Sequence, residues 1–152
     1  MFFPVDASCL AGASCLMAEV AVRLNEILAD ERACRNTLQL AEVRCRDPGQ
    51  KELIRRVLAA YDQICTELEN IVRAIGGVPV PTQAAQFSPQ PPEASLTDTL
   101  KTAESNQRDI IAPIDAVLEE HGLPGYGEPL LAIRQFHTDN IRWLAEALGT
   151  RQ

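Results

Sequence analysis

The chain has 152 residues, 46% of them hydrophobic and 23% charged, and its net charge is −7. This length predicts one domain, 1–152, that can build a core of its own. The acidic surface repels phosphate backbones, and four Phe, two Tyr and one Trp offer little for base stacking, so we expect no nucleic-acid partner. No apolar run reaches the roughly 18 residues needed to cross a bilayer, so we expect no membrane partner either.

The N-terminal segment, Met1 to Leu16, is mildly apolar. It has no Lys or Arg before Arg23, and Asp6 interrupts it, so we expect no secretory signal. Phe2 and Phe3 suggest apolar packing between two copies, which predicts a homodimer. The cysteines are odd in number and include no Cys-x-x-Cys pair: Cys9, Cys15, Cys34, Cys45 and Cys65. We interpret them as reduced, mostly packed thiols in a cytoplasmic protein.

Apolar residues at helical spacing predict an all-α fold with four helices, at about 14–45, 51–75, 95–121 and 129–148. Asp47-Pro48-Gly49 should end the first helix, and Gly76-Gly77 the second. Ser95-Leu96-Thr97-Asp98 resembles a capping box, and Pro129 suits the first turn of the fourth helix. The chain therefore predicts an antiparallel four-helix bundle.

The connection between the second and third helices, 76–94, is long and holds five of the ten prolines. Nineteen extended residues reach about 60 Å, whereas the second helix is about 37 Å long. The linker can therefore return along the whole bundle and start the third helix parallel to the second. The other two connections are short and predict antiparallel hairpins. A simple up-down-up-down bundle with a loose loop is the alternative.

Each predicted helix carries a polar residue on or beside its apolar seam, close to the helix midpoint. Glu31, Gln107 and His137 interrupt the seams of the first, third and fourth helices. Asp62 lies beside the seam of the second helix, and Arg134 lies next to His137. A polar group buried alone is costly. We therefore expect these residues to meet in one central layer of the core.

This arrangement resembles ferritin-like di-metal bundles, in which two helices each give a Glu and two give a Glu-x-x-His, all pointing inward. Glu31 stands at the first-helix Glu, and Asp62 with Cys65 at the second-helix pair. Gln107 replaces the third-helix Glu. Arg134 replaces the fourth-helix Glu, while His137 keeps the His. The segments LNEILADERA (24–33) and HTDNI (137–141) also resemble small bacterial ferritin-like proteins of unassigned function.

The resemblance implies two readings of the central layer. In the first, Arg134 turns inward and neutralises Glu31 or Asp62, Gln107 and His137 complete a metal-free polar network, and no cofactor is needed. In the second, Glu31, Asp62, Cys65 and His137 hold a single Fe or Zn ion. A working di-metal site is not expected, because Gln is a poor ligand and Arg repels metals.

Two functions follow from these readings. The first is a non-catalytic bundle that acts as an interaction or small-ligand-binding protein. The second is a mononuclear metalloprotein or oxidoreductase that uses the remaining ligands. Cys65 and His137 could also form a nucleophilic pair, but no oxyanion hole or loop motif supports such catalysis. The sequence does not decide between an enzyme and a binding protein.

Overall fold

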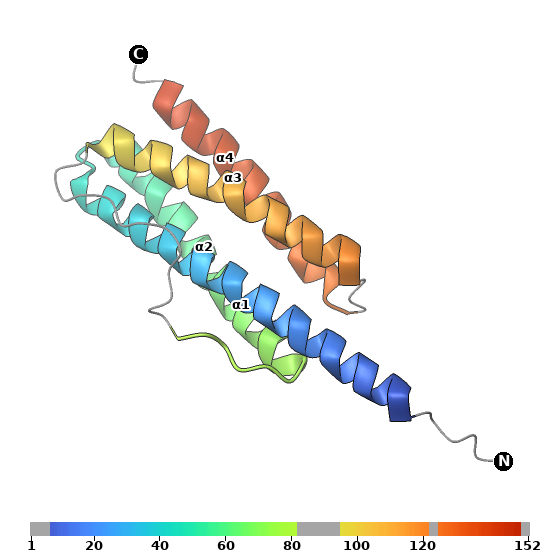
Figure 1. Cartoon of the computed structure of the whole chain (residues 1–152). Helices are drawn as coiled ribbons and strands as arrows, with labels where there is room; N and C mark the ends of the chain where they lie inside the picture. The colour runs from blue at the N-terminus through green and yellow to red at the C-terminus, as the bar shows by residue number, and fades with distance from the viewer. Residues whose placement is uncertain (1–6, 82–94, 122–124, 150–152) are drawn as a thin grey trace.

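The computed structural model describes residues 7–81, 95–121 and 125–149. These ranges contain four helices: α1 (Ala7–Arg44), α2 (Pro48–Ala74), α3 (Leu96–His121) and α4 (Gly127–Gly149), as Figure 1 shows. The all-α four-helix bundle predicted from the sequence is confirmed. None of these helices is long and apolar enough to pass through a membrane. Phe2 and Phe3 lie outside the described residues, so the homodimer stays a prediction.

Ser95 caps the start of α3 as expected, whereas α2 begins at Pro48 rather than at about residue 51. Asp47 caps α2, because its carboxylate accepts a hydrogen bond from the Gln50 amide at 2.8 Å, and Pro48 follows in the first turn. Ser95 precedes α3, where its hydroxyl accepts from the Asp98 amide at 3.1 Å and donates to the Asp98 carboxylate at 2.7 Å. These bonds satisfy amide groups that have no partner within the helix.

The end of α2 turns the chain sharply onto α1. Gly76 has φ +88, and its amide donates to the Arg73 carbonyl, while the Gly77 amide donates to the Val72 carbonyl at 2.8 Å. These two bonds form a Schellman motif, which favours glycine at the left-handed position. A Cβ at Gly77 would lie 2.8 Å from the Cβ of Ala21. The second glycine is therefore needed for the close approach to α1.

The first residues after this turn run back along α1. The Asn25 side chain donates to the Val78 carbonyl at 2.9 Å and accepts from the Val80 amide at 2.7 Å. Arg32 donates to the Val80 carbonyl and pairs with Glu69 at 2.8 Å. The linker therefore starts its return beside α1. Residues 82–94, which complete it, lie outside the described part of the chain.

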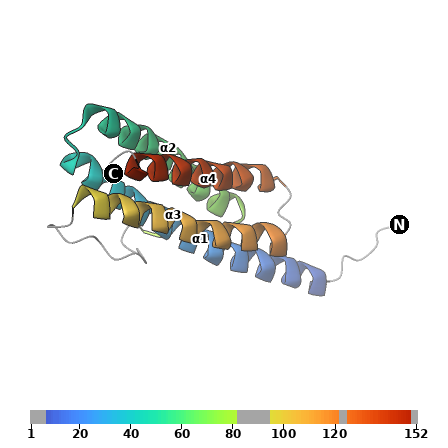
Figure 2. The ribbon, with the colours of Figure 1, turned by 90° about the horizontal axis from the view of Figure 1, so that it is seen from above.

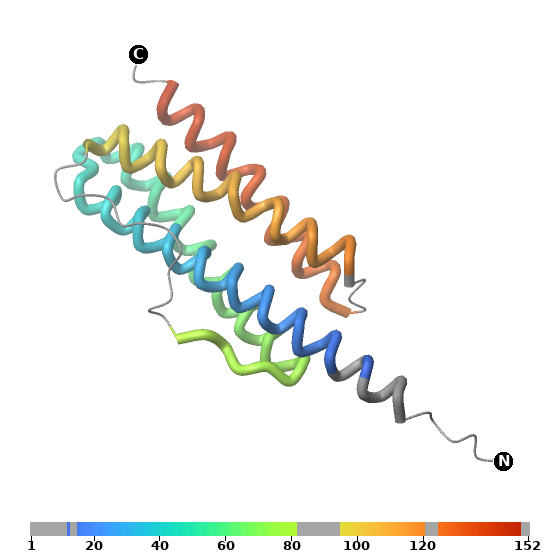
Figure 3. The backbone as a smooth tube through the Cα atoms, in the orientation of Figure 1, coloured from blue at the N-terminus to red at the C-terminus, as the bar shows by residue number. Residues whose placement is uncertain are grey.

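The order of the helices around the bundle is α1, α2, α4, α3. α1 packs against both α2 and α3, α4 packs against α3, and α2 and α4 touch in only a few places. Viewed from above, α2 lies beside α4 and α3 beside α1 (Figure 2). The chain trace in Figure 3 shows that α2 and α3 run in the same direction, antiparallel to α1 and α4. The parallel arrangement of the second and third helices, joined by a long crossover, is therefore confirmed.

The core is built from one face of each helix. Leucine, isoleucine and valine fill it together with Cys34, Cys45, Tyr61 and Cys65. Cys15, Cys34, Cys45 and Cys65 are free thiols, while the side chain of Cys9 is outside the described residues. Polar side chains also lie in this interior, and they define the candidate site.

Candidate functional site

A hydrogen bond between Glu31 on α1 and His137 on α4 crosses the middle of the bundle. The His137 Nε2 atom lies 2.6 Å from the Glu31 Oε1 atom, and both side chains are 0% exposed. α1 and α4 occupy diagonal positions, and their backbones do not come close to each other. The two residues therefore meet only because both point into the core, as expected from the seams that they interrupt.

Aromatic rings enclose the imidazole. The Tyr61 ring on α2 lies 5.9 Å from the His137 ring, and the Phe136 ring lies 5.5 Å from it, both edge to face. Tyr61 and Phe136 also contact each other edge to face at 5.7 Å. Edge-to-face contacts of this kind are a preferred geometry and add to the stability of buried rings. The Glu31–His137 bond thus lies in an apolar setting, where a hydrogen bond is stronger and an unpaired charge more costly.

The buried carboxylate affects the ionisable groups around it. Burial, reinforced by the negative charge of Glu31, raises the pKa of Cys34 well above its usual range and the pKa of Cys65 to about 11. Burial likewise raises the pKa of Tyr61 far above its usual value. Both thiols and the phenol are therefore neutral at physiological pH. Neutral thiols are weak nucleophiles and weak metal ligands.

Two amides are also buried completely, Gln107 on α3 and Asn140 on α4. Neither side chain makes a hydrogen bond within the described part of the protein. The Glu31 Oε2 and His137 Nδ1 atoms also have no hydrogen-bond partner there. Buried polar atoms normally have partners. These buried atoms can therefore form hydrogen bonds with further polar groups.

Asp62 does not lie in the central layer, which corrects the sequence-based expectation. Its carboxylate is exposed and pairs with Arg35 of α1 at 2.8 Å. Its neighbour on the helix face, Cys65, is buried. Asp62 lies beside the α2 seam rather than on it, so its short side chain reaches the neighbouring helix and not the core.

Arg134 also lies outside the central layer, which corrects its expected pairing with Glu31. Its guanidinium binds Asp115 of α3 through Nε at 2.5 Å and Nη2 at 3.2 Å. Both side chains are about one-third exposed, at 39% and 34%. This ion pair further raises the pKa of Arg134. The partner of Glu31 is therefore His137.

Asn140 and Asp30 are among the buried polar residues that the seam pattern did not reveal. Asn140 follows His137 by three residues, a spacing that places both on one helix face, and this could have indicated its burial. Asp30 precedes Glu31 and is 9% exposed, although it is charged and lies off the seam. Burial, with help from Glu31, raises the pKa of Asp30 from 3.8 to about 6.

These residues do not fit a ferritin-like di-metal centre. Such a centre needs four inward carboxylates and two imidazoles, whereas the interior presents the Glu31 carboxylate and the His137 imidazole, already bonded to each other. Among the described residues, no three His, Cys, Asp or Glu side chains gather closely enough to hold a metal ion. No di-metal chemistry is assigned to this chain.

Solved structures with the same helix arrangement share little sequence with this chain. A Dps protein from Bacillus brevis matches with a TM-score of 0.78 and 19% identity. A ferritin-like, diiron-carboxylate protein from Bacillus anthracis str. Ames matches with a TM-score of 0.73 and 15% identity. In both cases the match covers 88% of this chain and 97% of the other.

No model of a protein family matches the chain, and no curated protein matches it. Structural similarity at such low sequence identity is evidence for the fold alone. The resemblance inferred from the seams is confirmed at that level: this chain has the ferritin-like four-helix-bundle fold.

Proposed function

We propose that this chain is a non-catalytic ferritin-like bundle that acts as a binding protein rather than as an iron oxidase. The observation that carries the proposal is the Glu31–His137 bond. In this position a carboxylate and an imidazole would serve as metal ligands, but here they are hydrogen-bonded to each other. Asp62 and Arg134, which could have supplied further charge, are engaged on the surface.

The chemistry of the surrounding groups supports the same proposal. The thiols of Cys34 and Cys65 and the phenol of Tyr61 are neutral, because burial and the Glu31 charge raise their pKa values. A nucleophile at this place would need a group that ionises readily. The central layer thus supplies a rigid scaffold, and binding takes place on the outside of the bundle.

The test is iron oxidation and metal content. Protein purified without an affinity tag is analysed for metals and then mixed with Fe²⁺ in air. We expect substoichiometric metal and no Fe²⁺ oxidation above that of buffer, for the wild type and for Glu31→Gln alike. Glu26→Gln, which removes an exposed carboxylate from the same helix, is the matched control. Oxidation that requires Glu31 but not Glu26 would contradict the proposal.

A second candidate is a single divalent ion held by Glu31 and His137. The unpaired Glu31 Oε2 and His137 Nδ1 atoms, together with the Gln107 and Asn140 amides, favour it. Glu31 and His137 would provide the charged and the imidazole ligand, with amide oxygens as weaker ones. In the same assay this candidate predicts one equivalent of retained Fe or Zn, which is lost in Glu31→Gln.

A further inference from the structure

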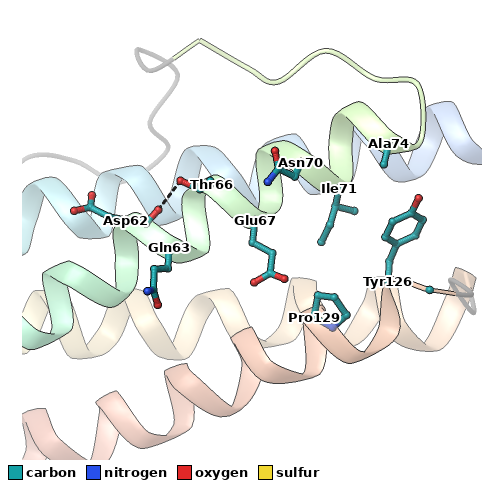
Figure 4. A pocket seen from close by; sticks show the side chains of 10 residues that line it. Asp62, Gln63, Thr66, Glu67, Asn70, Ile71, Ala74, Tyr126 and Pro129 are labelled. Atoms are coloured by element: carbon teal, nitrogen blue, oxygen red, sulfur yellow. Dashed lines mark hydrogen bonds between the residues drawn. The ribbon is translucent and has the colours of Figure 1, made fainter.

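The seam between α2 and α4 is the open side of the bundle, and it contains two hollows. The first has a volume of about 600 Å³ and lies between the second half of α2, from Asp62 to Ala74, and the start of α4 (Figure 4). The second has a volume of about 460 Å³ and lies between the start of α2 and the end of α4. They lie at opposite ends of one seam, and this pair of hollows is here called the α2–α4 groove.

The first hollow combines an apolar wall with one unpaired carboxylate. Ile71, Tyr126 and Pro129 form the apolar part. Glu67 extends from α2 across the seam toward α4, as Figure 4 shows. Among the described residues no hydrogen bond or ion pair holds this carboxylate. The lining contains no Lys or Arg, so the hollow favours a cationic group beside apolar surface.

The second hollow, at the other end of the seam, also combines apolar surface with acidic side chains. Leu53 and Trp143 provide apolar surface, and Trp143 is 40% exposed. Asp47 and Glu146 are the charged residues of the lining, which again includes no Lys or Arg. Exposed Trp and Tyr side chains are the residues that most often dominate binding energy at protein interfaces. The α2–α4 groove carries the exposed Trp143 and the partly buried Tyr126.

We propose that the α2–α4 groove docks an amphipathic helix of a partner protein, with basic residues of that helix facing Glu67. This inference rests on the proposed binding function and names the surface and the chemistry of the partner. A helix laid in a groove between two helices is a common recognition mode. The two hollows together span α2 from Leu53 to Ala74, about 32 Å at 1.5 Å per residue, so a partner helix of about 20 residues would reach both.

The negative charge of this surface favours a helix of another protein over a second copy of this chain as the occupant of the groove. The chain carries a net charge of −7, and the lining of both hollows is acidic. A second copy would in general bring more negative charge to this surface, which is unfavourable. A basic helix would instead pair its cations with Glu67 while its apolar face covers Tyr126 and Trp143.

The probe is a synthetic 20-residue peptide, of about the length derived above, with Leu and Lys at helical spacing. A second peptide of the same pattern has every Lys replaced by Glu. Binding is followed by calorimetry and by the fluorescence of Trp143, the single Trp of the chain. We expect the Lys peptide to bind and change the Trp143 signal, and the Glu peptide not to bind. Glu67→Lys and Tyr126→Ala should each weaken binding about tenfold or more.

The matched control is Glu119→Lys, which makes the same charge change at an exposed position of α3, the helix diagonal to α2. Circular dichroism confirms that each variant is folded. Equal weakening by Glu67→Lys and Glu119→Lys would overturn the proposal, because binding would then follow net charge alone. Failure of the wild type to bind the Lys peptide, or equal binding of the Glu peptide, would also overturn it.

Sedimentation of the free protein tests the other occupant. A dimer that dissociates in both Glu67→Lys and Tyr126→Ala would place a second copy in the groove and contradict a foreign helix. None of these variants touches Glu31 or His137, so the iron-oxidation assay is unaffected by them. The two proposals can therefore be disproved separately, because peptide binding tests the groove and iron oxidation tests the proposed binding function.

Discussion

Removing either member of the Glu31–His137 pair should destabilise the protein severely, whereas removing both should not. The side chains are 0% exposed and 2.6 Å apart. Taking one partner from such a pair leaves a buried polar group without its hydrogen bond, at a cost of about 3–5 kcal/mol. For a domain of this size that corresponds to a fall in Tm of roughly 6–20 °C. Replacing both by hydrophobic residues is neutral or stabilising by about 1–4 kcal/mol.

The assay is a double-mutant cycle with Glu31→Leu, His137→Leu and the double variant, unfolded in urea and followed by circular dichroism. We expect each single variant to lose about 3–5 kcal/mol and the double variant to stay close to the wild type. If a single variant does not fold, recovery of folded protein in the double variant gives the same answer. Additive losses, with the double variant the least stable, would refute the pairing.

Three further predictions concern Asp30, the cysteines and Arg134. Asp30→Asn should stabilise the protein above about pH 6, because the folded pKa of Asp30, about 6, exceeds its ordinary value of 3.8. The stability contributed by protonated Asp30, up to about 3 kcal/mol, is complete below pH 3.8 and is lost as pH rises through 6. Urea titrations that show equal pH dependence for both proteins would contradict this. Iodoacetamide should label exposed Cys15 well before buried Cys34 and Cys65, whose pKa values are raised; mass spectrometry that finds Cys34 or Cys65 labelled first in folded protein would disprove it. Arg134→Leu should leave Tm almost unchanged because the Arg134–Asp115 pair is partly exposed. A large fall in Tm would indicate instead that Arg134 is part of the core.

The helices and their topology could be predicted because two strong signals agree. Apolar periodicity marks four helices, and the length of the proline-rich linker allows the crossover that makes α2 and α3 parallel. α1 begins at Ala7 rather than near residue 14, because the intervening residues are small or apolar and nothing among them stops a helix. Helix starts without a strong cap are the part that periodicity determines least.

The interior site was predictable only where a polar residue interrupts a seam. Glu31, Gln107 and His137 do so, and all three are completely buried. Asp62 and Arg134 lie beside their seams, and one residue turns a helix by about 100°. Such a position lies at the edge of the core, where a charged side chain can reach either inward or to a neighbouring helix.

The choice at those two positions depends on partners that periodicity does not reveal. Arg35 draws Asp62 toward α1, and Asp115 draws Arg134 toward α3. The bond between Glu31 and His137 was likewise not predictable from either helix alone. It follows from the diagonal placement of α1 and α4, which is a property of the assembled bundle.

The central claim is that His137 is bonded to Glu31 and holds no metal, and histidine NMR tests it most directly. The chain has two histidines, His121 and His137, so a ¹⁵N-edited imidazole spectrum is simple, and His137→Leu assigns it. We expect a slowly exchanging Nε2–H signal from His137 that stays in place when Zn²⁺ is added. A stoichiometric shift of the His137 signals with Zn²⁺, accompanied by loss of that proton, would contradict the account.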